Sequence, residues 1–212
     1  MAELYSDTKM MKISKAVKIT YRVSMILGLV SLIMLICFNF AGVFTIQTLP
    51  GTKYDNAFTY PGWQSIFFGM GEMMIQGYTE SSFNIITFLA FFISLLSLII
   101  CSILYLKSAK RKGTNRKKVI LESIMAGTLV IGAFLLFFCD QLWILNASKV
   151  TGSYQNYYTE YLLPAINGEV MFKKTIYPTL LLVVSLLTCV VKIFNAGLLI
   201  YQKKYAKNAK KA

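Results

Sequence analysis

Two residues of the sequence stand out by their chemistry, because each places a charge inside a long apolar run. Lys192 lies in "TCVVKIFNAG", within a run that extends from Ile176 to Tyr201. Glu122 lies near the start of another apolar run, which begins at Val119. A charge near the middle of a membrane helix costs at least ~2.5 kcal/mol on insertion scales, so each residue needs a partner or a function.

The depths of these two charges predict that they meet. At about 1.5 Å of rise per residue, the Lys192 Cα atom lies roughly 13 Å from the Tyr201 end of its helix, and its stem can carry the ammonium about 6 Å back toward that end. Glu122 reaches a similar depth from the same side. We predict a Glu122–Lys192 ion pair with Asn195 as a third member. A structural role is favoured over an ion or proton path, which would need acidic groups continuing across the membrane.

A second polar set is expected near the opposite ends of the spans. It consists of Asn39, Asp140 and Gln141, and Asp140 lies roughly one turn inside the boundary marked by Asn146. Asp140 is expected to contact Asn39, Gln47 or the loop that covers the bundle. Hydrogen bonding at a helix end is the favoured interpretation, and capture of a cation or a basic partner is the alternative.

The sequence offers no set of residues for catalysis, metal binding or cofactor binding. It contains no histidine, which removes the commonest general base and metal ligand. It also lacks G-x-S-x-G and Walker A motifs. The cysteines lie inside apolar runs without C-x-x-C spacing, which argues against zinc sites and structural disulfides. These are Cys37, Cys101, Cys139 and Cys189.

The elements that position these residues are membrane-spanning helices. Hydrophobic residues make up 56% of the chain and charged residues 15%, against about 25% charged in a soluble domain. A helix needs roughly 20 residues to cross about 30 Å of hydrocarbon. The sequence therefore predicts an all-α integral membrane four-helix bundle in one domain, residues 1–212. Its expected spans are Tyr21–Thr48, Phe83–Leu106, Val119–Asn146 and Ile176–Tyr201.

The distribution of basic residues predicts the orientation of the spans. Five lie before or at the start of the first span, the last of them being Arg22; seven lie between the second and third spans, and five follow the fourth, whereas the other two loops hold four. Positive residues favour the cytoplasmic side, so both termini are expected there. We interpret these clusters as topology signals that also attract anionic lipids of the inner leaflet, and not as a nucleic-acid site. Lysines spaced along residues 1–20 fit either an amphipathic helix on that leaflet or a helical extension of the first span.

Small residues along each span predict which face packs against the other helices. In the fourth span, Lys192 shares its face with small side chains, so it is expected to point inward. The four predicted stripes are Ser24, Gly28 and Ser31; Ala90, Ser94, Ser97 and Cys101; Ser123, Gly127 and Val130; and Ser185, Cys189, Lys192 and Ala196.

Both external segments carry apolar or aromatic residues that suit a partner surface. The first offers Trp63, Phe67 and Met70 on one helical face, and residues 62–77 are expected to be a re-entrant element, an interfacial element or a cap. The second is rich in tyrosine and includes Tyr157 and Tyr161. An aromatic belt at the membrane boundary is the favoured interpretation for these tyrosines, and a contact surface is the alternative.

The stretch "YPGWQSIFFG", with Gly62-Trp63-Gln64 and Phe68-Gly69, resembles small four-span membrane proteins of AT-rich, low-GC bacteria. The topology is also similar to that of claudin-type tetraspan proteins, although the first external loop lacks their cysteine pair. The resemblance implies a multi-pass protein of a bacterial plasma membrane. High Lys, Ile, Asn, Phe and Tyr content agrees with an AT-rich genome.

Together these features favour a non-enzymatic scaffold or accessory subunit of a membrane complex, which contacts a protein partner or further copies of itself through its external loops. The alternative is a small transporter or an oligomeric channel. The polar groups divide into one set near each membrane face, which favours the scaffold.

Overall fold

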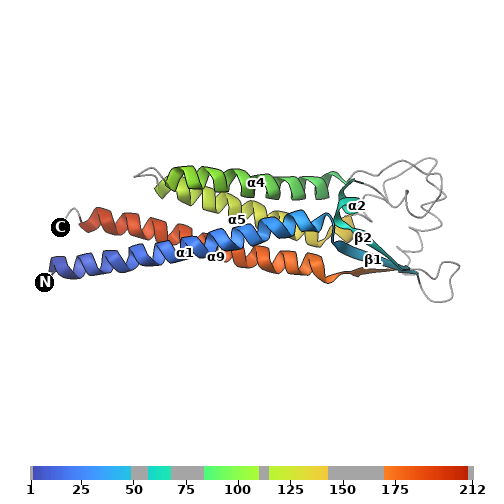
Figure 1. Ribbon diagram of the computed structural model, residues 1–212, viewed down its shortest axis with the longest axis horizontal. Helices are drawn as coiled ribbons and strands as arrows, with labels where there is room; N and C mark the ends of the chain where they lie inside the picture. Colours follow the sequence, from blue (N-terminus) through green and yellow to red (C-terminus); the bar gives the residue numbers. More distant parts are fainter. Residues whose placement is uncertain (1, 49–56, 68–83, 110–114, 143–169, 210–212) are drawn as a thin grey trace. The chain divides into compact units, whose positions relative to one another are not determined.

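The computed structural model describes residues 2–48, 57–67, 84–109, 115–142 and 170–209 (Figure 1). The fold is all-α in class, as predicted, and four of its helices are long and apolar enough to cross a membrane. They are α1 (Ala2–Phe38), α4 (Ile85–Ala109), α5 (Asn115–Phe137) and α9 (Ile176–Ala209).

Large apolar side chains cover the outward faces of these helices. Ile26 of α1 is 62% exposed, Ile131 of α5 is 64% exposed and Val190 of α9 is 66% exposed. A soluble monomer rarely exposes apolar surface of this extent. The chain is therefore a multi-pass protein embedded in a membrane.

The first predicted span was too long at its C-terminal end. Helix α1 ends at Phe38, and Gly42–Thr48 forms strand β1 instead. The amides of Phe40 and Ala41 both bond to the Cys37 carbonyl, which closes the last turn. The sequence "GVFTIQT" contains four β-branched residues and one aromatic residue among seven, which favours a strand although its hydropathy matches that of a helix.

Other helix boundaries also differ from the sequence prediction. Helix α1 starts at Ala2, so the basic N-terminal segment is a continuous extension of the first span and not a separate amphipathic helix. Helix α5 ends at Phe137, and a further helical turn covers residues 139–142. Helix α9 begins at Ile176, as expected, and continues past Tyr201 to Ala209.

The strands form a small antiparallel sheet that the sequence did not predict. Its order is β2 (Ala57–Pro61), β1, β3 (Val170–Lys174). Phe44 of β1 pairs with Tyr60 of β2 on one side and with Lys174 of β3 on the other. The sheet therefore joins two segments that are far apart in the sequence.

The short helix α2 (Gly62–Phe67) follows β2 directly. The Gly62 amide bonds to the Ala41 carbonyl at 3.1 Å, and the Trp63 amide bonds to the Asn39 carbonyl at 3.2 Å. A Cβ atom at Gly62 would collide with the carbonyl oxygen and ring of Phe38, so this approach requires glycine. These bonds hold α2 against the end of α1.

The chain divides into two compact units. The chain-end unit contains Met1–Ile33, Ile93–Ile131 and Val183–Ala212, and the sheet unit contains Met34–Phe92 and Gly132–Leu182. Along each long helix the buried positions recur three and four residues apart, the spacing of a helix-bundle core. In the chain-end unit many of these positions are polar.

A buried charged cluster as the candidate functional site

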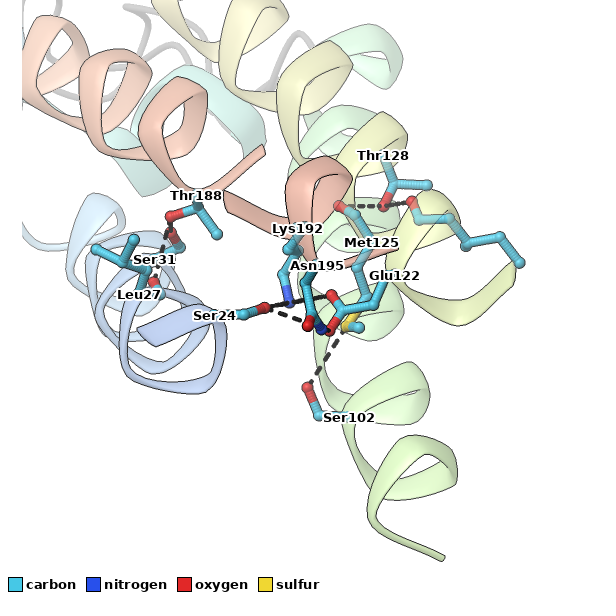
Figure 2. Close-up of polar contacts among 11 residues, drawn as sticks. Ser24, Leu27, Ser31, Ser102, Glu122, Met125, Thr128, Thr188, Lys192 and Asn195 are labelled. Carbon is cyan, nitrogen blue, oxygen red and sulfur yellow. Dashed lines mark hydrogen bonds and ion pairs between the residues drawn. The ribbon is translucent and has the colours of Figure 1, made fainter. Parts of the chain in front are cut away.

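The candidate site lies in the chain-end unit and is centred on the predicted pair. The Lys192 Nζ atom of α9 lies 3.0 Å from the Glu122 Oε2 atom of α5. The Lys192 side chain is 2% exposed and that of Glu122 is 1% exposed, so both charges are withdrawn from lipid and water. The ion pair that the sequence predicted is confirmed. Figure 2 shows the two side chains pointing toward each other.

Two further side chains complete the hydrogen bonding of this carboxylate. Asn195, one turn after Lys192 on α9, donates from Nδ2 to Glu122 Oε1 at 2.9 Å, which confirms it as the third member. Ser24 of α1 is fully buried, with its hydroxyl 3.3 Å from both carboxylate oxygens. Lys192 also donates to the Ser24 hydroxyl at 3.3 Å. The cluster therefore links α1, α5 and α9.

Helix α4 borders the cluster through Tyr105, which is 3% exposed. Its hydroxyl lies in the neighbourhood of Asn195 and Glu122. The Tyr105 ring stacks on that of Tyr21 of α1, with centroids 5.1 Å apart. All four long helices thus contribute side chains around Glu122. We call Ser24, Tyr105, Glu122, Lys192 and Asn195 the charged cluster.

Hydroxyl contacts fix the helices on either side of the charged cluster. The Ser31 and Thr188 hydroxyls lie 2.8 Å apart and join α1 to α9. The Thr128 hydroxyl bonds to that of Ser97 at 2.7 Å, and Ser94 bonds to the Thr128 carbonyl at 3.1 Å, which joins α4 to α5. Polar contacts between small side chains are a common means of holding helices together in lipid.

The predicted small-residue stripes agree with this packing in part. Ser24, Ser31, Ser94 and Ser185 are fully buried. The stripe on α5 was wrong, because its first two members, Ser123 and Gly127, are exposed. The buried face of α5 instead follows Glu122 at helical spacing, through Met125, Ala126 and Leu129. On α9, Thr188 is buried while Cys189 is intermediate.

Asp140 of the sheet unit has a different partner from those expected. It forms an ion pair with Lys174 of β3, with 3.4 Å between Nζ and Oδ1. The Lys174 ammonium also lies 3.7 Å from the centre of the Phe137 ring, a cation–π distance. Asn39 bonds to the Ile36 carbonyl within its own helix end. No role for Lys174 was predicted beyond its contribution to the count of basic residues.

The proposed partner surface lies mostly outside the described side chains. Trp63 is half-buried on α2, and its neighbour Ile66 is fully buried. The Phe67 side chain, Met70, Tyr157 and Tyr161 lie outside the described part of the chain. Residues 62–67 lie against the end of α1, and residues 68–77 of the predicted re-entrant, interfacial or cap element lie outside the described part of the chain.

The charged cluster contains a serine beside a lysine, an arrangement that acts as a nucleophile and base only when the lysine is neutral. In this cluster the Lys192 nitrogen is instead held in an ion pair with the Glu122 carboxylate. Ser24 is also fully buried, so no substrate reaches its hydroxyl in this arrangement. The geometry therefore supports a structural or ion-binding use of the cluster and gives no support to hydrolysis.

Within the described ranges, no three His, Cys, Asp or Glu side chains gather in a way that could hold a metal ion. All four cysteines are free thiols.

No protein-family model, no curated protein and no solved structure matches this chain.

Proposed function

We propose that the chain is a non-enzymatic scaffold or accessory subunit of a membrane complex, with both termini in the cytoplasm of a bacterial cell. The observation that carries this proposal is the charged cluster. The Glu122 carboxylate of α5 accepts hydrogen bonds from side chains of α1 and α9. Glu122 and Lys192 carry the only full charges in the cluster, and these charges neutralise each other. Such a cluster stabilises one helix arrangement and leaves the external segments to contact a partner.

The cluster also fits a scaffold because of its energetics. A buried ion pair adds little net stability compared with apolar packing, but breaking it is costly. Its contribution is therefore to specify which helices are neighbours. The sheet unit supplies a second fixed arrangement, in which β1 is paired on both sides and Asp140 binds Lys174.

The direct test is crosslinking in native membranes followed by copurification in mild detergent. We expect a stoichiometric partner protein or a defined homo-oligomer. Combined Trp63→Ser, Phe67→Ser and Met70→Ser changes should release it without unfolding the helices. Lys192→Met serves as the matched control, since it lowers stability without altering the external segments. Recovery of the wild-type chain alone and monomeric would contradict the proposal.

A small transporter or oligomeric channel is the second candidate, and one observation favours it. Polar side chains recur along the buried face of α9 at Ser185, Thr188, Lys192 and Asn195. The Ser185 hydroxyl is buried and, within the described part of the chain, has no hydrogen-bond partner. If this face conducts an ion, Lys192→Met should abolish flux into proteoliposomes while the helices remain folded. Equal flux through the wild type and the Lys192→Met variant would exclude this use of Lys192.

A further inference from the structure

The ends of α1 and α9 continue beyond the other long helices of the chain-end unit. Ser31 meets Thr188 and Ser24 meets Lys192, so α1 and α9 are antiparallel neighbours in this unit. Continuing the same register places Ile13 opposite residues 203–206. Ile13 is 9% exposed, as expected if α9 covers it.

The neighbouring helices end earlier. Tyr21 stacks on Tyr105, and α4 ends four residues after Tyr105, at Ala109. Ser24 bonds to Glu122, and α5 begins seven residues before Glu122, at Asn115. Both ends therefore lie level with about residue 17 of α1. Among the described elements of this unit, only α1 and α9 extend further (Figure 1). We call residues 2–16 and 200–209 the stalk.

A first group of exposed cations lies where the apolar outer faces end. Exposed Ile19, Ile120 and Leu106 mark the edge of the hydrocarbon-facing surface in this unit. Long basic side chains at such an edge extend into the lipid headgroups and attract anionic lipid. The members of this headgroup tier are Lys18, Arg22, Lys107, Arg116 and Lys117.

A second group of exposed cations lies on the stalk. Its members, Lys12, Lys15, Lys203 and Lys204, come from both helices and fall at similar levels. By the register above the two groups lie on average about six residues apart, or about 9 Å at 1.5 Å per residue, and the nearest members, Lys15 and Lys18, are three residues apart. The headgroup region on one side of a bilayer is only about 5–7 Å thick. The second group, the stalk tier, therefore reaches past the lipid.

Nothing described on the stalk neutralises these charges. Its described side chains include no carboxylate, and Glu3 and Asp7 lie nearer the chain end, outside the described side chains. Met11, next to Lys12, is 74% exposed. A flexible apolar side chain among lysines suits contact with another protein, because methionine adapts its packing to varied partners.

We infer that the stalk is a docking surface for an acidic segment of a protein on the side of the chain ends. The four lysines supply charge complementarity and Met11 supplies apolar contact. This inference adds a second contact surface to the proposed scaffold. It places the partner in the cytoplasm only if the proposed orientation holds, but the test below does not depend on orientation.

The test measures binding of a polyglutamate peptide to the full chain in nanodiscs of phosphatidylcholine and phosphatidylglycerol. We expect the combined changes Lys12→Gln, Lys15→Gln, Lys203→Gln and Lys204→Gln to weaken binding about tenfold or more, since these lysines supply the charge. The matched control removes four charges from the headgroup tier, through Lys18→Gln, Arg22→Gln, Lys107→Gln and Lys117→Gln. It should weaken binding less than about threefold because these residues lie among lipid headgroups.

Three results would overturn the inference. Equal losses in the two variants would mean that the peptide senses overall charge and not the stalk. If the wild type binds the peptide in nanodiscs of phosphatidylcholine alone but loses this binding when the nanodiscs also contain phosphatidylglycerol, anionic lipid is the occupant. Tighter binding of an RNA oligonucleotide with the same number of charges would make nucleic acid the partner. All altered residues are exposed, and circular dichroism checks that both variants keep their helices.

Discussion

Lys192 and Glu122 lie 70 residues apart in the sequence, yet their charged atoms lie 3.0 Å apart in the interior of the chain-end unit. Each is the other's charge partner, and Ser24 and Asn195 satisfy the remaining hydrogen-bonding capacity of the carboxylate. Removing one member leaves an uncompensated charge, whereas removing both leaves a polar but neutral site. This asymmetry makes the pair testable.

We expect Lys192→Met and Glu122→Gln each to lower the free energy of unfolding in detergent by about 3–5 kcal/mol, the usual cost of breaking a buried pair. The double variant should recover part of the loss, with a coupling energy of about 0.5–3 kcal/mol. Denaturant titration followed by circular dichroism measures all three. Lys117→Met is the control, because this lysine is exposed and is not part of the charged cluster. Losses that simply add would mean that the two charges do not interact.

Gly28 of α1 faces the same lysine. A Cβ atom at Gly28 would lie 3.6 Å from the Lys192 Nζ atom, an ordinary contact distance, so Gly28→Ala should be tolerated. Gly28→Leu should displace the ammonium and cost about 1–3 kcal/mol, as overpacking of a core does. Gly127→Leu is the matched control, because a Cβ atom there meets nothing within 4 Å. Thermal unfolding of the three variants checks the order, and equal losses for the two leucine variants would show that Lys192 is not crowded.

Tyr60 allows a test of the sheet unit. It lies outside the spans, and burial raises its pKa from 10.0 to about 12. The unfolded chain releases the Tyr60 proton at a lower pH than the folded chain does. The contribution of the buried neutral phenol to stability is therefore complete below pH 10 and decreases as the pH rises toward 12. The slope is about 1.4 kcal/mol per pH unit in that window. Tyrosinate absorbance of the wild type minus that of Tyr60→Phe should titrate near pH 12; a midpoint near 10 would mean that Tyr60 is solvated.

The charged pair could be predicted from the sequence because both helices have marked ends. Basic residues show where each span meets the headgroups, and a fixed rise per residue converts position into depth. The buried face of α5 was harder to predict. Small size suggested that Ser123 and Gly127 face inward, but burial follows Glu122, because a charge must leave the lipid whereas a glycine can face it.

The sheet and its ion pair could not be predicted in this way. Hydropathy does not separate a strand from a helix in "GVFTIQT", and the pairing of β1 with β3 joins segments more than one hundred residues apart. That pairing brings Lys174 to Asp140. A contact made by long-range strand pairing leaves no periodic signal in either segment, so depth counting did not identify Lys174 as a partner of Asp140.

Orientation is the prediction on which the side of each partner depends. Seventeen basic residues occupy the segments on one side of the spans and four occupy those on the other. In a background with all four cysteines changed to alanine, a cysteine at Thr52 should react with an impermeant maleimide in intact cells. A cysteine at Thr114 should react only after the cells are opened, since "KSAKRKGTNRKK" is retained on the cytoplasmic side. The cysteine-free chain is the control for background labelling, and its unfolding temperature shows whether the background is sound. The reverse labelling pattern would place the sheet in the cytoplasm and the stalk, with its acidic partner, on the outer face.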